Sequence, residues 1–156
     1  MGTNSTGEFT ASLTIPELVR VVGVGDLDFG TYSGGTDMTR NERVCVYTNN
    51  SGGTYKVKAS GDSNSTGGSG TAFYIKQSGA VIPYYVDWND EASDGGSALT
   101  AGSFLTSQSG ANTTSTNCAG GDNANFQVTF TKDNILDHPA GIYTGVLTVL
   151  ISFGAS

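Results

Sequence analysis

The sequence contains few positive charges and no long apolar run. Seven basic residues stand against 14 acidic ones, and the basic residues form no cluster. A nucleic-acid partner is therefore not expected, because phosphate binding requires a concentrated basic surface. No apolar stretch approaches the roughly 18 residues of a membrane-spanning helix, so we expect a soluble mature protein without direct membrane insertion.

Groups that carry catalysis or bind metals are also scarce. The single histidine, His138, stands beside a proline in a segment typical of a turn. The sequence has no GxSxG elbow, no phosphate-binding glycine loop before a helix and no HExxH motif. Acidic groups at residues 26–28 and 87–94 do not follow the twelve-residue calcium loop. We therefore predict no enzyme activity, no catalytic residues, no metal and no cofactor.

The only two cysteines, Cys45 and Cys118, lie far apart and lack CxxC or Cys/His spacing. A disulfide is favoured, and closing a loop of about 70 residues stabilises a fold by about 4 kcal/mol on the chain-entropy account. A disulfide implies an oxidising compartment and export. Met1 and the small polar residues after it are interpreted as standing in place of a removed leader. The alternative is two buried free thiols in a cytosolic protein.

Short alternating segments recur along a chain that is rich in glycine and in small polar residues, and no helical apolar stripe of useful length appears. A hairpin loop is expected at residues 48–54, a short strand within 97–106 and one helical turn within 131–141. Residues 60–70 and 89–124 are expected to be polar linkers. The predicted strands cover residues 18–22, 26–30, 43–48, 54–60, 71–77, 81–88, 125–131 and 141–153.

The alternation also predicts which side chains form the core of one domain. Two apolar strand faces are expected to pack against each other in an all-β sandwich. Exposed aromatic rings could instead bind sugars, and Tyr74, Tyr84, Tyr85 and Trp88 are the candidates. We expect Tyr84 and Trp88 to point inward, which leaves Tyr85 as the better exposed candidate. The two faces consist of Ile82, Tyr84, Val86 and Trp88, and of Phe126, Val128 and Phe130.

The two ends of the chain carry the clearest alternation. Near the start, "GEFTASLTIP" places Phe9, Ala11, Leu13 and Ile15 on one face of an extended segment. Such order is unusual for a terminus and indicates that this segment pairs with a partner. At the other end, Gly145 interrupts a segment whose apolar face consists of Tyr143, Leu147, Val149, Ile151 and Phe153.

These ends, together with "LDFGTYSGG", "VCVYTNNSGGTYKVKASG" and "PAGIYTGVLTVLISF", resemble chaperone-usher pilins, most closely the archaic type that is similar to spore coat protein U domains. In that family a Gly-x-Tyr segment opens a final alternating strand, which Gly141 and Tyr143 match. Many members of that family carry a cysteine in the first core strand, whereas residues 18–22 of this chain contain none. Phe153 also lies fourth from the end, where the family has an aromatic residue nearly at the terminus.

The resemblance implies an immunoglobulin-like β-sandwich that lacks its final strand and exposes an apolar groove. A periplasmic chaperone would fill the groove first, and the N-terminal strand of the next subunit would replace it at an outer-membrane usher. Residues 1–16 would then form the donor-strand extension, with Pro16 ending it, and residues 17–156 the pilin-like domain. The donor strand would consist of Phe9, Ala11, Leu13 and Ile15, and the groove wall of Tyr143, Leu147, Val149, Ile151 and Phe153.

On this interpretation the protein is a structural subunit of an extracellular adhesive pilus. The pilus is a head-to-tail homopolymer at the cell surface, and its subunits reach it after passage through the periplasm. Three alternatives stay open. Residues 8–15 could form an ordinary strand of their own sheet, with Pro16 at a bulge. The chain could be a minor or tip adhesin with a carbohydrate-binding sandwich. A secreted enzyme would require a site that the sequence does not reveal.

Overall fold

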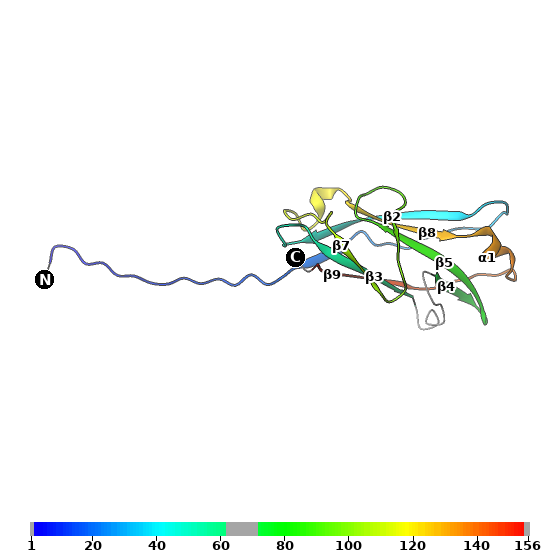
Figure 1. Cartoon of the computed structure of the whole chain (residues 1–156), viewed down its shortest axis with the longest axis horizontal. Coiled ribbons are helices and arrows are strands. Elements are labelled where there is room, and N and C mark those ends of the chain that lie inside the picture. The colour runs from blue at the N-terminus through cyan, green and yellow to red at the C-terminus, as the bar shows by residue number, and fades with distance from the viewer. Residues whose placement is uncertain (1, 62–71, 155–156) are drawn as a thin grey trace.

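The computed structural model describes residues 2–61 and 72–154, which form two antiparallel β-sheets (Figure 1). The larger sheet has the strand order β1-β2-β8-β5-β4, and the short β6 pairs with the end of β5. Its strands are β1 (Val19–Val22), β2 (Met38–Thr48), β4 (Ala72–Gln77), β5 (Ala80–Asn89), β6 (Ser97–Ala98) and β8 (Ala124–Phe130). The smaller sheet has the order β7-β3-β9, with β3 (Tyr55–Gly61), β7 (Phe104–Gln108) and β9 (Leu147–Phe153).

In residues 2–61 and 72–154, helical structure is limited to one turn of 3-10 helix, η2 (Cys118–Gly120), and to the short α1 (Lys132–Leu136). The helical turn predicted within 131–141 is thus confirmed. Thr131 caps α1 through its side chain, which accepts a hydrogen bond from the Asn134 backbone. Within the described residues no helix is both long and apolar enough to cross a membrane.

The core lies between the two sheets, and the predicted apolar faces of β5 and β8 both point into it. Trp88 is 1% exposed, and its ring lies 4.4 Å from that of Phe126 in the same sheet. From the smaller sheet, Tyr55 meets the Trp88 ring edge-on at 6.1 Å. A strand side chain points to one face at every second residue, so the alternation alone was enough to identify these faces. The other buried residues of the two predicted faces are Ile82, Tyr84, Val86, Val128 and Phe130.

The hairpin predicted at residues 48–54 is wrong. Strand β2 belongs to the larger sheet and β3 to the smaller one, so the loop between them crosses from one sheet to the other. Glycine and asparagine at this point do permit a turn, but they do not determine whether the chain returns to the same sheet.

The strand predicted at residues 26–30 is also wrong. Instead, the Asp28 carboxylate accepts a hydrogen bond of 2.7 Å from the backbone of Gly30, which has a φ of +69°. This local turn competes with strand pairing. The neighbouring Phe29 still packs against the core, with its ring edge-on to Phe130 at 4.8 Å.

The final strand is shorter than predicted because the chain changes sheets at Gly145. Just before it, Thr144 pairs with Lys76 of β4, at the edge of the larger sheet. From Leu147 onward the chain pairs with β3 of the smaller sheet. A Cβ at Gly145 would lie 3.0 Å from the Ile75 side chain, so the close approach of these segments favours glycine.

The long segment between β5 and β8 contains β6 and β7, where one short strand was predicted within 97–106. The far end of this segment is attached to β2. Cys45 and Cys118 form a disulfide with a Cα–Cα distance of 5.8 Å. Nearby, Asn123 accepts a hydrogen bond from the Val46 backbone and donates to the carbonyl groups of Val46 and Gly110. Of the linker predicted at 60–70, residues 62–70 lie outside the described part of the chain.

Candidate functional site

The N-terminal segment projects away from the sandwich as an extended tail, which we define as residues 2–16 (Figure 1). The tail contains no strand, and the large apolar side chains of its alternating face are among the most exposed in the protein. Phe9 is 93% exposed, Leu13 85% and Ile15 70%. Ala11 on the same face is exposed as well. In a single chain, therefore, nothing covers the apolar face of the tail.

The base of the tail is attached to the domain by Asn49. Its side-chain amide donates to the carbonyl of Pro16 at 2.8 Å, and its side-chain oxygen accepts from the Leu18 backbone at 2.9 Å. The Asn49 backbone also donates to the Leu18 carbonyl at 3.1 Å. These bonds fix the point at which the tail leaves the sandwich, immediately before β1.

One edge of β9 has no partner strand among residues 2–61 and 72–154. Its other edge pairs with β3 over its whole length, from Leu147 opposite Gly61 to Phe153 opposite Tyr55. The unpaired edge lies on the same side of the sandwich as β1, whose Cα atoms come within 8 Å of those of β9. A sheet edge of this kind presents backbone groups that a further strand can bind.

The side chains that line this edge are only partly covered. Ile151 is buried, but Leu147 and Val149 on the same face are half-buried although they point toward the core. Val19 and Val21 of β1 are half-buried in the same way. Apolar side chains that face a core and remain accessible mark a surface that further apolar groups can cover.

The structure places the predicted donor and wall residues apart in the single chain. The four predicted donor residues lie on the tail, and Leu147, Val149, Ile151 and Phe153 lie on the core-facing side of β9. Tyr143 precedes the change of sheet at Gly145 and is therefore not part of β9. Its hydroxyl donates to the Pro139 carbonyl at 2.9 Å, which ties it to the turn after α1.

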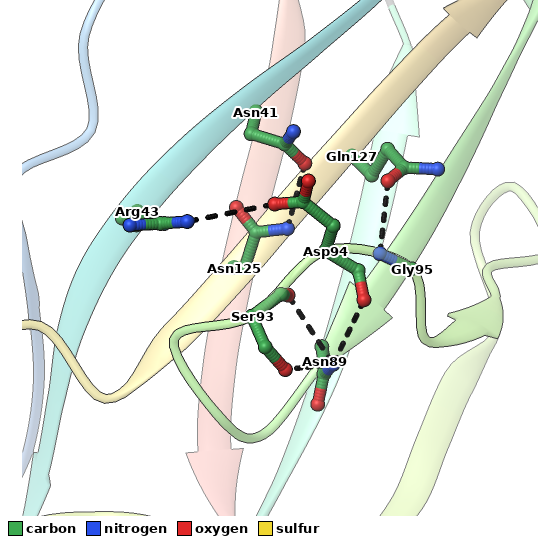
Figure 2. Close-up of polar contacts among 8 residues, drawn as sticks. All are labelled: Asn41, Arg43, Asn89, Ser93, Asp94, Gly95, Asn125 and Gln127. Atoms are coloured by element: carbon green, nitrogen blue, oxygen red, sulfur yellow. Dashed lines mark hydrogen bonds and ion pairs between the residues drawn. The ribbon is translucent and has the colours of Figure 1, made fainter.

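The acidic loop after β5 uses its polar groups to hold its own position on the larger sheet (Figure 2). Asp94 forms an ion pair with Arg43 at 3.5 Å, and the backbone of Gly95 donates to the Gln127 side chain. Asn125, which is fully buried, donates to the Asn41 side chain. Among the described residues, no group of three or more histidine, cysteine or acidic side chains could hold a metal ion.

Among the residues that the structure describes, two ionisable groups have pKa values shifted by burial. Burial raises the pKa of the Tyr55 phenol, which therefore stays neutral. Partial burial raises the pKa of the Asp87 carboxyl on the outer face of β5. His138 lies at the end of α1, with its Nδ1 atom 2.6 Å from the Asn134 carbonyl oxygen.

No known protein family and no curated protein matches the sequence. Among solved structures, the fold is similar to a chain in one described as "Chaperone-tip adhesin complex is vital for synergistic activation of CFA/I fimbriae biogenesis", with a TM-score of 0.59 and 16% identity. The match covers 88% of this chain and 42% of that chain. The similarity shows a shared fold, and the protein has an immunoglobulin-like β-sandwich fold.

A second solved structure is the CsuC-CsuE chaperone-tip adhesion subunit pre-assembly complex from archaic chaperone-usher Csu pili of Acinetobacter baumannii. The match has a TM-score of 0.48 and 18% identity, and it covers 90% of this chain and 40% of that one. The protein described here thus spans less than half the length of either chain.

Proposed function

We propose that the protein is a structural subunit of an extracellular adhesive pilus, of the archaic chaperone-usher type that resembles spore coat protein U domains. Residues 1–16 act as the donor strand, and residues 17–156 form the domain that accepts the donor strand of a neighbour. One observation carries the proposal. A single chain exposes both an alternating apolar tail and an unpaired strand edge over a partly covered core.

The physical argument is that each of these features would be unfavourable if it stayed exposed. Burial of Phe9, Leu13 and Ile15 would contribute about 1.5–3 kcal/mol for each side chain, before the backbone hydrogen bonds to β9 are counted. The tail cannot fold back onto the edge of its own domain without reversing direction, since it points away from the sandwich (Figure 1). Pairing with a second copy is the simpler solution, and Pro16 ends the ladder because it has no N–H group.

Transfer of the tail to a neighbour is a head-to-tail contact between two different surfaces, so repetition produces an open filament. Before assembly the same edge requires protection against aggregation. We assign this protection to a periplasmic chaperone and the exchange of strands to an outer-membrane usher. The similarity in fold to a chain from a chaperone-tip adhesin complex supports this assignment. The filament would then be displayed at the cell surface.

The test is polymerisation of the purified full chain, followed by electron microscopy and by size-exclusion chromatography. Leu13→Asp places a charge on the apolar face of the tail and should abolish filaments. Thr14→Asp adds the same charge to the opposite face and should leave filaments intact. Filaments of normal length from the Leu13→Asp chain would refute the donor-strand role.

A second candidate function is that of a minor or tip adhesin that binds carbohydrate. The observation that favours it is Tyr85, which is 37% exposed on the outer face of β5 and lies opposite Thr129 of β8. An exposed ring beside polar side chains suits the apolar face of a sugar. Binding of the full chain to a glycan array, lost in Tyr85→Ala, would support this role over that of a purely structural subunit.

A further inference from the structure

The position of the tail determines its direction in a filament, an inference that depends on the proposed donor-strand function. The tail leaves the domain at the end where β9 finishes, opposite the end that carries α1 (Figure 1). If all subunits point the same way, the tail enters the next domain at its α1 end. It then runs antiparallel to β9 of that domain.

The alternation does not define the register of this pairing by itself. A slip of one residue would turn the apolar side chains outward, but a slip of two residues preserves both faces. In the register with the greatest overlap, Phe9 lies opposite Phe153 and Ile15 opposite Leu147, so that four donor side chains meet four residues of β9. Glu8 then lies opposite Gly154, on the outer face of the sheet.

A pocket lies beside Gly154, at the end of the smaller sheet. Its volume is about 430 Å³, and its lining includes Thr54, Lys56, Thr106, Ser107, Ser109 and Gly154. Lys56 faces outward from β3, opposite Ser152 of β9. Its ammonium group lies 4.7 Å from the Phe104 ring centre and has no carboxylate partner among the described residues. The Lys58 ammonium group lies 4.8 Å from the same ring, so this face is locally basic in a protein whose net charge is -7.

Gly154 packs against the backbone of β3, where a Cβ would lie 2.9 Å from the Tyr55 nitrogen, so this position places no side chain between a donor strand and the pocket. A donor strand beside β9 would lie about 10 Å from β3, which is two strand spacings. Lys56 lies opposite Ser152, two residues along the strand from Gly154, and extended glutamate and lysine side chains on the same face are long enough to span both separations. Glu8 and Glu17 are the only charged side chains in the first 19 residues, and of the two only Glu8 lies at the Gly154 end of the paired segment.

We propose that Glu8 of one subunit binds Lys56 of the next in the pocket at Gly154, and that this ion pair fixes the register of the donor strand. The apolar side chains supply the affinity, and the ion pair selects one of the registers that they allow. Charge complementarity at a rim commonly acts in this way.

The first test uses filaments of full chains that carry Glu8→Lys, Lys56→Glu or both changes. Each single change places like charges at every junction and should speed filament dissociation about threefold at low salt, whereas the double change should restore the original rate. The differences should disappear in 1 M salt, where the screening length is about 3 Å. Glu17→Lys, which lies outside the paired segment, is the matched control and should have no effect.

The second test reads the register directly through cysteine pairs in the full chain. Thr10 and Ser152 would lie opposite each other, with Cα atoms about 5 Å apart, and Thr10→Cys with Ser152→Cys should link neighbouring subunits into a ladder on a non-reducing gel. Thr10→Cys with Leu150→Cys reports a slip of two residues and should not link them.

Three outcomes are decisive. Rescue by the double charge change together with the predicted ladder supports the ion pair. Unchanged dissociation in both single variants, or preferential linking through Leu150→Cys, overturns it while leaving the donor-strand function intact. Filaments of the Leu13→Asp chain overturn the donor-strand function itself.

Discussion

Thr144 and Lys76 exchange two backbone hydrogen bonds, of 2.9 and 3.1 Å, which attach the start of the C-terminal segment to the edge of β4. Three residues later the chain has joined the smaller sheet at Leu147. The last segment therefore closes one side of the larger sheet before it forms β9. Gly145 lies at the crossing, within reach of both Tyr74 and Ile75.

Gly145→Ala should destabilise the domain by about 1–3 kcal/mol, because a Cβ there would lie 3.0 Å from the Ile75 side chain and 3.1 Å from the Tyr74 carbonyl oxygen. Gly52→Ala is the control, since its Cβ would make only ordinary contacts at 3.5 Å. Urea unfolding of the two variants checks this prediction. Equal stability of the two variants would contradict the tight crossing at Gly145.

Asn49→Ala should loosen the base of the tail. The substitution removes the side-chain bonds to Pro16 and Leu18, and each such bond contributes about 1 kcal/mol. The amide proton of Leu18 should then exchange faster with solvent, whereas that of Val57 in the core of the smaller sheet should be unaffected. Hydrogen exchange followed by mass spectrometry or NMR measures both, and unchanged exchange at Leu18 would argue against this anchor.

Reduction of the Cys45–Cys118 disulfide should lower the free energy of unfolding by about 4 kcal/mol, because it releases a loop of about 70 residues in the unfolded chain. The measurement is denaturant unfolding with and without reductant. The Cys45→Ala, Cys118→Ala double variant serves as the control, because reductant should not change its stability. A native protein whose stability is insensitive to reduction would show that the bond does not constrain the fold.

Asp87→Asn should stabilise the domain at neutral pH by about 0.5 kcal/mol or less. Burial raises the pKa of Asp87 above its ordinary value of 3.8, so the folded state disfavours the charged form. Stability from this group is present below the unfolded pKa and is lost as the pH rises through the folded pKa. The advantage of asparagine should therefore vanish near pH 3. Asp26→Asn, which removes an exposed charge of the same sign, is the control for the change in net charge.

Alternation was a sufficient guide wherever a strand buries one face. The inward faces of β5 and β8 are found as predicted because every second residue is large and apolar, and packing tolerates no other register. Connections were harder to predict. A loop rich in glycine and asparagine has the same composition whether it closes a hairpin or crosses between sheets, so the route from Thr48 to Tyr55 was not predictable from sequence.

The tail could be identified from sequence, but the way in which it is anchored could not. Phe9, Leu13 and Ile15 stand out as an alternating set at a terminus, and the structure leaves them uncovered. Asn49, in contrast, acts on residues that lie more than 30 positions earlier in the chain. No local pattern distinguishes it from the adjacent Asn50, which caps its own turn.

The direct continuation of the tail into β1 has a mechanical consequence. Any tension on the tail first meets the Asn49 bonds to Pro16 and Leu18 and then acts along β1, whose four residues pair with Cys45 to Thr48 of β2. Force along a strand stretches the hydrogen bonds of all four pairs together in shear, whereas a perpendicular pull would open them one at a time. Cys45, which pairs with Val22 at the end of this ladder farthest from the tail, is bonded to Cys118. The force is thus transmitted to a part of the sandwich that is cross-linked by a disulfide.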